Sequence, residues 1–274
     1  MKPSKLIRLL QGVLVPCLVL GLWHWLSSSG LVNPLILPSP LAVAKRWFQY
    51  LSPYEPFDPA KSGYLAWLVS GELLHDAYAS LHRVVSGFLI GAGLALPLGL
   101  FMGASDNVYK LFNPLIQVLR PIPPIAFIPL AILWFGLGNP PAVFLITIGA
   151  FFPMLMNTIA GVRHVDAIYI RAAESLGANR RALFVRVMLP AASPYILAGA
   201  RIGMGTAFIV VIVAEMIAVN SGLGYRILEA REFFWSDKII AGMITIGLLG
   251  LALDTGMSAL NNWLLKWHRG IEHR

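Results

Sequence analysis

Three ionisable side chains, Arg201, Glu215 and Asp254, lie within long apolar runs of the sequence. A charge at membrane depth costs about 2.5–3.5 kcal/mol on insertion scales, so each of them needs a physical reason. Arg201 precedes Glu215 by 14 residues, which places both on one helical face but about 21 Å apart. This face, with Gly205 and Phe208, is a candidate wall of a translocation path. The alternative is that Glu215 holds an external loop through hydrogen bonds.

Asp254 has a different setting from the other two charges. Small or polar residues flank it at helical spacing, namely Gly247, Gly250 and Ser258. A stripe of that kind faces protein and not lipid, so we expect Asp254 to bond to a neighbouring helix.

Further polar positions occur where prolines interrupt the apolar pattern. Arg120 and Pro124 lie in a segment that also holds Pro121, Pro123 and Pro129. Broken backbone at membrane depth is tolerated where it is buried or lines a cavity, so this segment is a second candidate for the path. Asn157 and Thr158, which follow Pro153, add neutral polar groups. Simple packing is the alternative for all of these.

The sequence offers no pattern typical of an enzyme site. The six histidines are not at the metal-binding spacing of a zinc protease, and the chain has no Gly-x4-Gly-Lys-Ser/Thr phosphate loop. We therefore expect no catalytic residue, metal or ATP site in this chain. An intramembrane enzyme would need converging catalytic groups, and a secondary transporter would need an inverted repeat. These two classes are the alternatives to the function considered below.

The elements that carry these residues must be membrane-spanning. The chain has 274 residues, of which 57% are hydrophobic and 12% charged, with a mean hydropathy of +0.72. Soluble domains have about 45–50% apolar and about 25% charged residues. Six apolar runs long enough to span a bilayer cover residues 7–25, 84–104, 115–137, 142–162, 196–219 and 239–260. The single cysteine, Cys17, excludes an internal disulfide.

These runs divide the chain into four regions. Residues 1–29 form an N-terminal span, 30–83 an external region, 84–262 a core of five spans with a cytoplasmic loop at 163–194, and 263–274 a tail. In the external region Ser39 and Pro40 predict the start of an interfacial helix, a Pro-rich stretch follows at 52–64, and 64–83 is expected to be helical. Glycine pairs four residues apart predict close helix packing, at Gly87/Gly91, Gly99/Gly103 and Gly199/Gly203.

Basic residues indicate the orientation. With the N-terminus in the cytoplasm, 14 of the 21 lysines and arginines fall on the cytoplasmic side or the adjoining helix ends. The net charge of +8 is therefore explained by topology, and nucleic acid is not needed as a partner.

The cytoplasmic loop predicts two short helices joined at a corner. Residues up to Leu176 suit a helix, Gly177 suits its end, and a second helix is expected from Arg180 until Pro190 stops it. Small residues would give the corner a knob-like surface that a partner could receive in a groove.

This loop resembles the cytoplasmic motif of permeases of binding-protein-dependent ABC importers. That motif reads Glu-Ala-Ala, three residues, Gly, nine residues, an aliphatic residue, any residue and Leu-Pro. The positions that fit are Ala172, Ala173, Gly177, Val187, Leu189 and Pro190. Arg171 stands where the motif has Glu, so a salt bridge from that position does not carry over. Segments 37–40, 120–136, 201–205, 214–216 and 222–224 look like the nitrate/sulfonate/taurine-type branch.

The resemblance implies an all-α fold of six transmembrane helices, as in type I (MetI-like) importers. The chain would be one of two identical permease subunits in a bacterial inner membrane, with both termini cytoplasmic. Two ATPase subunits would bind ATP and Mg²⁺, and an external binding protein would deliver a small oxyanion of the sulfonate/taurine, nitrate or bicarbonate type. The residues implied to contact the ATPase are Asp166, Arg171, Ala172, Ala173, Glu174, Ser175, Leu176, Gly177 and Ala178. The candidate path residues are Arg120, Pro124, Asn157, Arg201 and Glu215.

Overall fold

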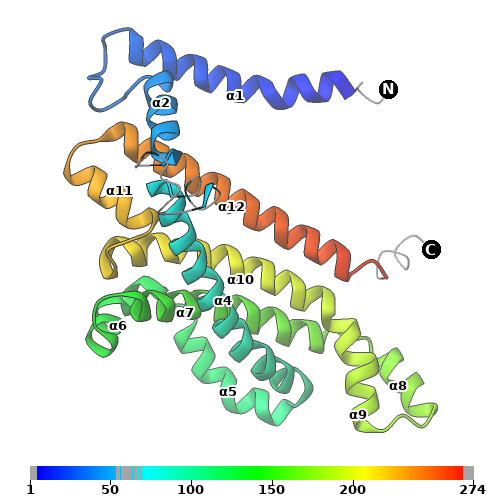
Figure 1. The fold of residues 1–274 in the computed structure, drawn as a ribbon. Coiled ribbons are helices and arrows are strands. Elements are labelled where there is room, and N and C mark those ends of the chain that lie inside the picture. The colour runs from blue at the N-terminus through cyan, green and yellow to red at the C-terminus, as the bar shows by residue number, and fades with distance from the viewer. Residues whose placement is uncertain (1–4, 54–55, 57–62, 65–66, 68–69, 268–274) are drawn as a thin grey trace. The chain divides into compact units, whose positions relative to one another are not determined.

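The computed structural model describes residues 5–53, 56, 63, 64, 67 and 70–267, and every regular element among them is a helix (Figure 1). Four described α-helices precede the first 3₁₀ turn: α1 (Lys5–Ser28), α2 (Pro40–Leu51), α4 (Glu72–Ala104) and α5 (Asp106–Leu119). A 3₁₀ turn, η1 (Pro124–Phe127), leads into α6 (Ile128–Phe135) and α7 (Asn139–Arg163). The chain continues through α8 (Ala167–Ser175), α9 (Arg180–Leu183), the π-helical η2 (Phe184–Met188), α10 (Leu189–Ala218), α11 (Leu223–Glu232) and α12 (Ser236–Leu264). Most of the predicted Pro-rich stretch and the end of the tail lie outside the described residues.

The predicted all-helical membrane fold is confirmed, and four or five of the six predicted spans are long and apolar enough within the described residues. Among the described residues, four helices are long and apolar enough to cross a bilayer: α4, α7, the continuous helix Arg180–Ala218, and α12. A fifth span results if α5 and the η1–α6 segment are counted together. In α1, the apolar stretch Gly12–Ser28 is shorter than these spans.

The third predicted span is not one helix. Its two halves, Asp106–Leu119 and Pro124–Phe135, meet at an angle of 83°. Pro121, Pro123 and Pro124 supply no backbone N–H at the break, so the α-helical hydrogen bonds cannot continue through it. The predicted interruption of this span is therefore confirmed, and the broken segment begins at Asp106, earlier than the predicted run 115–137.

The chain divides into two compact units. The first comprises residues 1–77 and 226–246, and the second comprises 78–225 and 247–274. In the first unit, the hydroxyl of Ser39 accepts a hydrogen bond from the Ala42 N–H and Pro40 begins α2, as predicted. Val43 and Tyr50 are the buried residues of α2, whereas Leu41 in its first turn is exposed.

The second unit is built around α7 and α10, which lie side by side (Figure 1). Buried side chains from both helices form its core, including Leu145, Ile146, Leu155, Ala207 and Val211. Helix α4 joins this core through the glycines of its two predicted pairs, Gly87/Gly91 and Gly99/Gly103. A Cβ atom at any of these four glycines would lie 2.5–2.7 Å from an atom of α7, at Ile146, Thr147, Thr158 or Val162. The glycine pairs of α4 thus serve close packing, as predicted.

Candidate coupling and transport sites

Helix α8 is fixed at both of its ends. The carboxylate of Asp166 caps the first turn by accepting a hydrogen bond of 2.9 Å from the Ile168 N–H. At the other end, the N–H of Gly177 donates to Glu174 O at 2.9 Å and the N–H of Ala178 donates to Ala173 O at 3.0 Å. This pair of bonds is the Schellman arrangement, and it requires the positive φ of +80° that Gly177 adopts. The predicted corner is therefore present and is closed by backbone hydrogen bonds.

The segment after the corner differs from its prediction in one respect. Asn179 caps α9, but Pro190 does not end the second helix, because the chain stays helical from Arg180 to Ala218. Pro190 stands in the first turn of α10, directly after the π-helical η2. A proline is tolerated at that position, and the wider π turn leaves room for its ring beside the preceding carbonyls.

The surface of α8 is open to solvent and partly apolar. None of its residues is buried, and the exposed fraction is 60% for Ile168, 59% for Tyr169 and 89% for Leu176 at its C-cap. Arg171, Ala172, Glu174, Ser175 and Gly177 are exposed as well, and Ala173 and Ala178 partly so. Figure 1 shows α8 and α9 together at one end of α10. The sequence prediction considered only the small residues of the corner and therefore missed Ile168 and Tyr169. Both were recognisable from the sequence as apolar residues in a polar loop.

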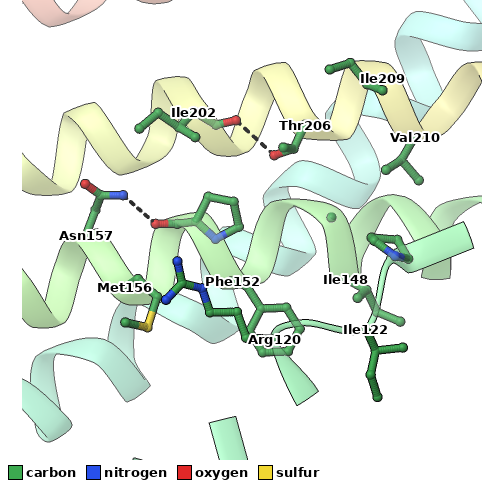
Figure 2. A pocket seen from close by; sticks show the side chains of 13 residues that line it. Arg120, Ile122, Ile148, Phe152, Met156, Asn157, Ile202, Thr206, Ile209 and Val210 are labelled. Atoms are coloured by element: carbon green, nitrogen blue, oxygen red, sulfur yellow. Dashed lines mark hydrogen bonds between the residues drawn. The ribbon is translucent and has the colours of Figure 1, made fainter. Parts of the chain in front are cut away.

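Three of the five candidate path residues lie together. Arg120, Pro124 and Asn157 line a cavity of about 460 Å³ in the second unit (Figure 2). Its other lining residues are Ile122, Ile148, Gly149, Phe152, Pro153, Met156, Ile202, Thr206, Ile209 and Val210. Arg201 and Glu215 do not line this cavity.

Glu215 belongs instead to a buried polar network. Its side chain is fully buried and accepts hydrogen bonds from Arg83 Nη1 at 2.7 Å, Ser80 Oγ at 2.8 Å and the Gly224 N–H at 3.0 Å. Arg83 also donates to the backbone oxygen of Ser221 at 3.0 Å. Glu215 therefore holds the loop after α10 against α4, which is the alternative that the sequence left open. A Cβ atom at Gly222, whose φ is +107°, would collide with the Glu215 carboxylate.

Arg201 forms a pair with Asp254, the third of the charges within the apolar runs. Its Nε and Nη2 atoms donate to the two carboxylate oxygens at 2.7 and 2.6 Å. The expectation that Asp254 bonds to a neighbouring helix is confirmed, since the two residues join α12 to α10. Arg201 and Glu215 were expected on one helical face. The partner of Arg201 lies on α12, however, whereas the side-chain partners of Glu215 lie on α4.

A second charged cluster, in the first unit, has no counterpart in the sequence predictions. Arg226 forms salt bridges with Glu72, Asp76 and Glu229 at 2.7, 2.5 and 2.8 Å. Burial opposes the charge on Arg226, but the hydrogen bonds to Asp76 and Glu229 outweigh it and raise the pKa of the guanidinium. The pKa of the Tyr50 hydroxyl is also raised, first by burial and then by the charge of Glu72.

Comparison with known proteins identifies this architecture. Residues 95–269 match the family described as binding-protein-dependent transport system inner membrane component. The chain belongs to this family. It is an ABC transporter permease, which is a multi-pass transport subunit of the inner membrane that works with ATPase and substrate-binding partners.

The permease resembles several relatives along almost its full length. The permease protein MJ0413 of Methanocaldococcus jannaschii is 40% identical, over 96% of this chain and 93% of the relative. The taurine transport system permease protein TauC of Escherichia coli is 34% identical, over 98% and 93%. The bicarbonate transport system permease protein CmpB of Synechococcus elongatus is 34% identical, over 94% and 91%.

Solved structures support the fold. The permease matches a chain of the MetNI methionine ABC transporter with a TM-score of 0.60 and 19% identity, covering 68% of this chain and 92% of that one. The fold of this permease is therefore that of a known ABC permease.

Proposed function

We propose that this permease is one of two identical transmembrane subunits of an ATP-driven importer for a small oxyanion. In this proposal an external binding protein delivers the solute, both chain termini are cytoplasmic, and α8 contacts the ATPase subunit. ATP and Mg²⁺ are bound by the ATPase, and this chain contributes no cofactor site.

The exposed α8 corner, which is capped at both ends, carries the proposal. An apolar side chain such as Leu176, with 89% of its surface exposed, is unfavourable in water unless a partner covers it. The Asp166 cap and the Gly177 corner hold the helix before any partner binds, which lowers the ordering cost of binding. A short amphipathic helix presented in this way suits a groove on a soluble subunit.

The substrate class is supported by the names of relatives. TauC is named for taurine and CmpB for bicarbonate, and both relatives are about equally similar to this permease. Both solutes are small and carry anionic oxygen atoms. We therefore infer a small oxyanion for this permease, without assigning one compound.

A glycine substitution with a matched control tests the role of α8. Gly177 and Gly30 both have positive φ, +80° and +73°, and a Cβ atom at either would meet nothing within 4 Å. Asn tolerates this backbone conformation, so Gly177→Asn and Gly30→Asn should both insert and fold normally. In the purified permease–ATPase complex, Gly177→Asn should lower transport per ATP hydrolysed by at least about tenfold, as expected for a disrupted interface anchor. Gly30→Asn should leave this ratio unchanged.

A second variant tests the same contact without introducing an asparagine at the corner. Leu176→Ser removes the exposed apolar side chain and should also uncouple ATP hydrolysis from transport, whereas Leu41→Ser, at a residue that is 77% exposed in α2, should not. Normal coupling in both Gly177→Asn and Leu176→Ser would contradict the proposed contact.

A further inference from the structure

The arginines of the second unit that lie in or beside the apolar runs differ in how their charge is balanced. Arg83 is paired with Glu215, and Arg201 is paired with Asp254. The side chain of Arg120 has no hydrogen bond or ion pair with any residue that the structure describes, and only its backbone N–H is bonded, to Ile116 O. Its guanidinium is thus a positive charge without a counter-ion in the described part of the chain.

The position of Arg120 makes this imbalance significant. It caps the C-terminus of α5, where the third apolar segment is broken, and it is exposed. It is also the only charged residue among the thirteen described residues that line the cavity. The cavity supplies no negative charge that would compete for this guanidinium, so an anion that enters the cavity can pair with it.

Asn157 can supply a further donor to the same anion. One N–H of its Nδ2 atom donates to Pro153 O at 2.9 Å, which leaves the second N–H free to bind a ligand oxygen. The planar guanidinium of Arg120 can bind two oxygens of a carboxylate-like or sulfonate-like group at once. Arg120 and Asn157 together therefore offer three or more donors to one oxyanion.

The other end of the cavity has the opposite character. Figure 2 shows Arg120, Met156, Asn157 and Ile202 toward one end, and Ile122, Ile148 and Ile209, without any charged residue, toward the other. A cavity of about 460 Å³ with one charged and one apolar end matches a small organic anion better than an inorganic one.

We propose that Arg120 and Asn157 form an oxyanion subsite within the permease itself, and that the isoleucines receive the apolar body of an organic anion. This inference rests on the proposed import of a small oxyanion and refines it. It assigns part of the selectivity to the membrane subunit, in addition to the external binding protein.

Arginine modification tests the subsite without requiring transport. The intact permease–ATPase complex is treated with phenylglyoxal, and the modification rates of Arg120 and of the exposed Arg231 are followed by mass spectrometry. Butanesulfonate at twice its Kd should slow the modification of Arg120 about threefold and leave Arg231 unaffected. Sulfate at the same ionic strength should protect Arg120 less. Equal effects on both arginines, or protection by sulfate as strong as by butanesulfonate, would overturn the proposal.

A variant at the apolar end tests the orientation of the ligand. Ile209→Ser, at a residue that is 67% exposed, should remove the advantage of butanesulfonate over sulfate. Ile217→Ser, on the same helix but outside this cavity, should preserve it. An unchanged advantage in Ile209→Ser would contradict the assignment of the apolar end.

Uptake by the complete transporter separates the two proposals. If the wild-type complex imports none of taurine, butanesulfonate, nitrate and bicarbonate, the proposed function fails, while selective protection of Arg120 would still support the subsite.

If uptake occurs, Arg120→Gln should reduce it at least about tenfold, the loss expected when a charge-assisted contact is removed. Lys110→Gln, which removes an exposed charge from the same helix, should not reduce it. Normal uptake by Arg120→Gln would overturn the subsite.

Discussion

At the scale of single residues, the Arg83–Glu215 pair shows how this permease accommodates buried charge. The two side chains are 5% and 0% exposed, and their partners come from α4, α7 and the loop after α10. Every oxygen of the Glu215 carboxylate has a donor, so the pair fixes the position of the loop.

Neutralising one member of the Arg83–Glu215 pair should lower the free energy of unfolding more than neutralising both members. Glu215→Gln leaves Arg83 buried without a counter-ion, and Arg83→Met leaves the carboxylate unpaired, each at a cost of about 3–5 kcal/mol. The double variant buries no uncompensated charge, so its loss should be smaller than either single loss. Denaturant unfolding of the detergent-solubilised permease measures all three, and additive losses would contradict this account.

Sequence reasoning identified Glu215 but not its partner. The spacing within one helix related Glu215 to Arg201, whereas the actual partner, Arg83, precedes Glu215 by 132 residues. Periodicity reports which face of a helix a residue occupies but not which distant segment packs against that face. For Asp254 the flanking small residues did indicate a neighbouring helix, although they did not identify Arg201.

At the scale of elements, the glycines of α4 determine how closely it approaches α7. A Cβ atom at Gly91 would lie 2.6 Å from Thr147 O, whereas one at Gly93 would meet nothing within 4 Å. The spacing of four residues predicted this packing correctly because close approach requires small residues on one face.

Two alanine substitutions distinguish packing from helix propensity. Gly91→Ala should lower the free energy of unfolding by about 1–3 kcal/mol, because the backbone carbonyl of Thr147 cannot easily move away. Gly93→Ala adds the same methyl group in open space and should be neutral or stabilising by up to about 1 kcal/mol. Equal effects of the two substitutions on unfolding would show that α4 does not pack as described.

Helix ends were predicted less well than helix positions. The cap at Ser39 and the corner at Gly177 follow from local chemistry, since side-chain and backbone donors within a few residues decide them. Pro190 was misassigned because the π-helical turn before it makes room for the proline ring, and no local pattern announces such a turn.

At the scale of the whole molecule, the basic residues predict a cytoplasmic N-terminus. Because Cys17 is the only cysteine, a Cys17→Ser background allows single cysteines to report the orientation. In intact cells a membrane-impermeant maleimide should label Ser52→Cys, and it should label Asn107→Cys only after permeabilisation. Both positions are exposed. The reverse pattern of labelling would require the opposite orientation.

The central claim is that this permease imports a small oxyanion at the expense of ATP. The direct measurement is uptake of radiolabelled taurine, nitrate and bicarbonate into proteoliposomes that contain the permease, its ATPase and its binding protein. We predict uptake of at least one of these anions that requires both ATP and the binding protein. Uptake driven by an ion gradient without ATP would contradict the account and favour a secondary transporter.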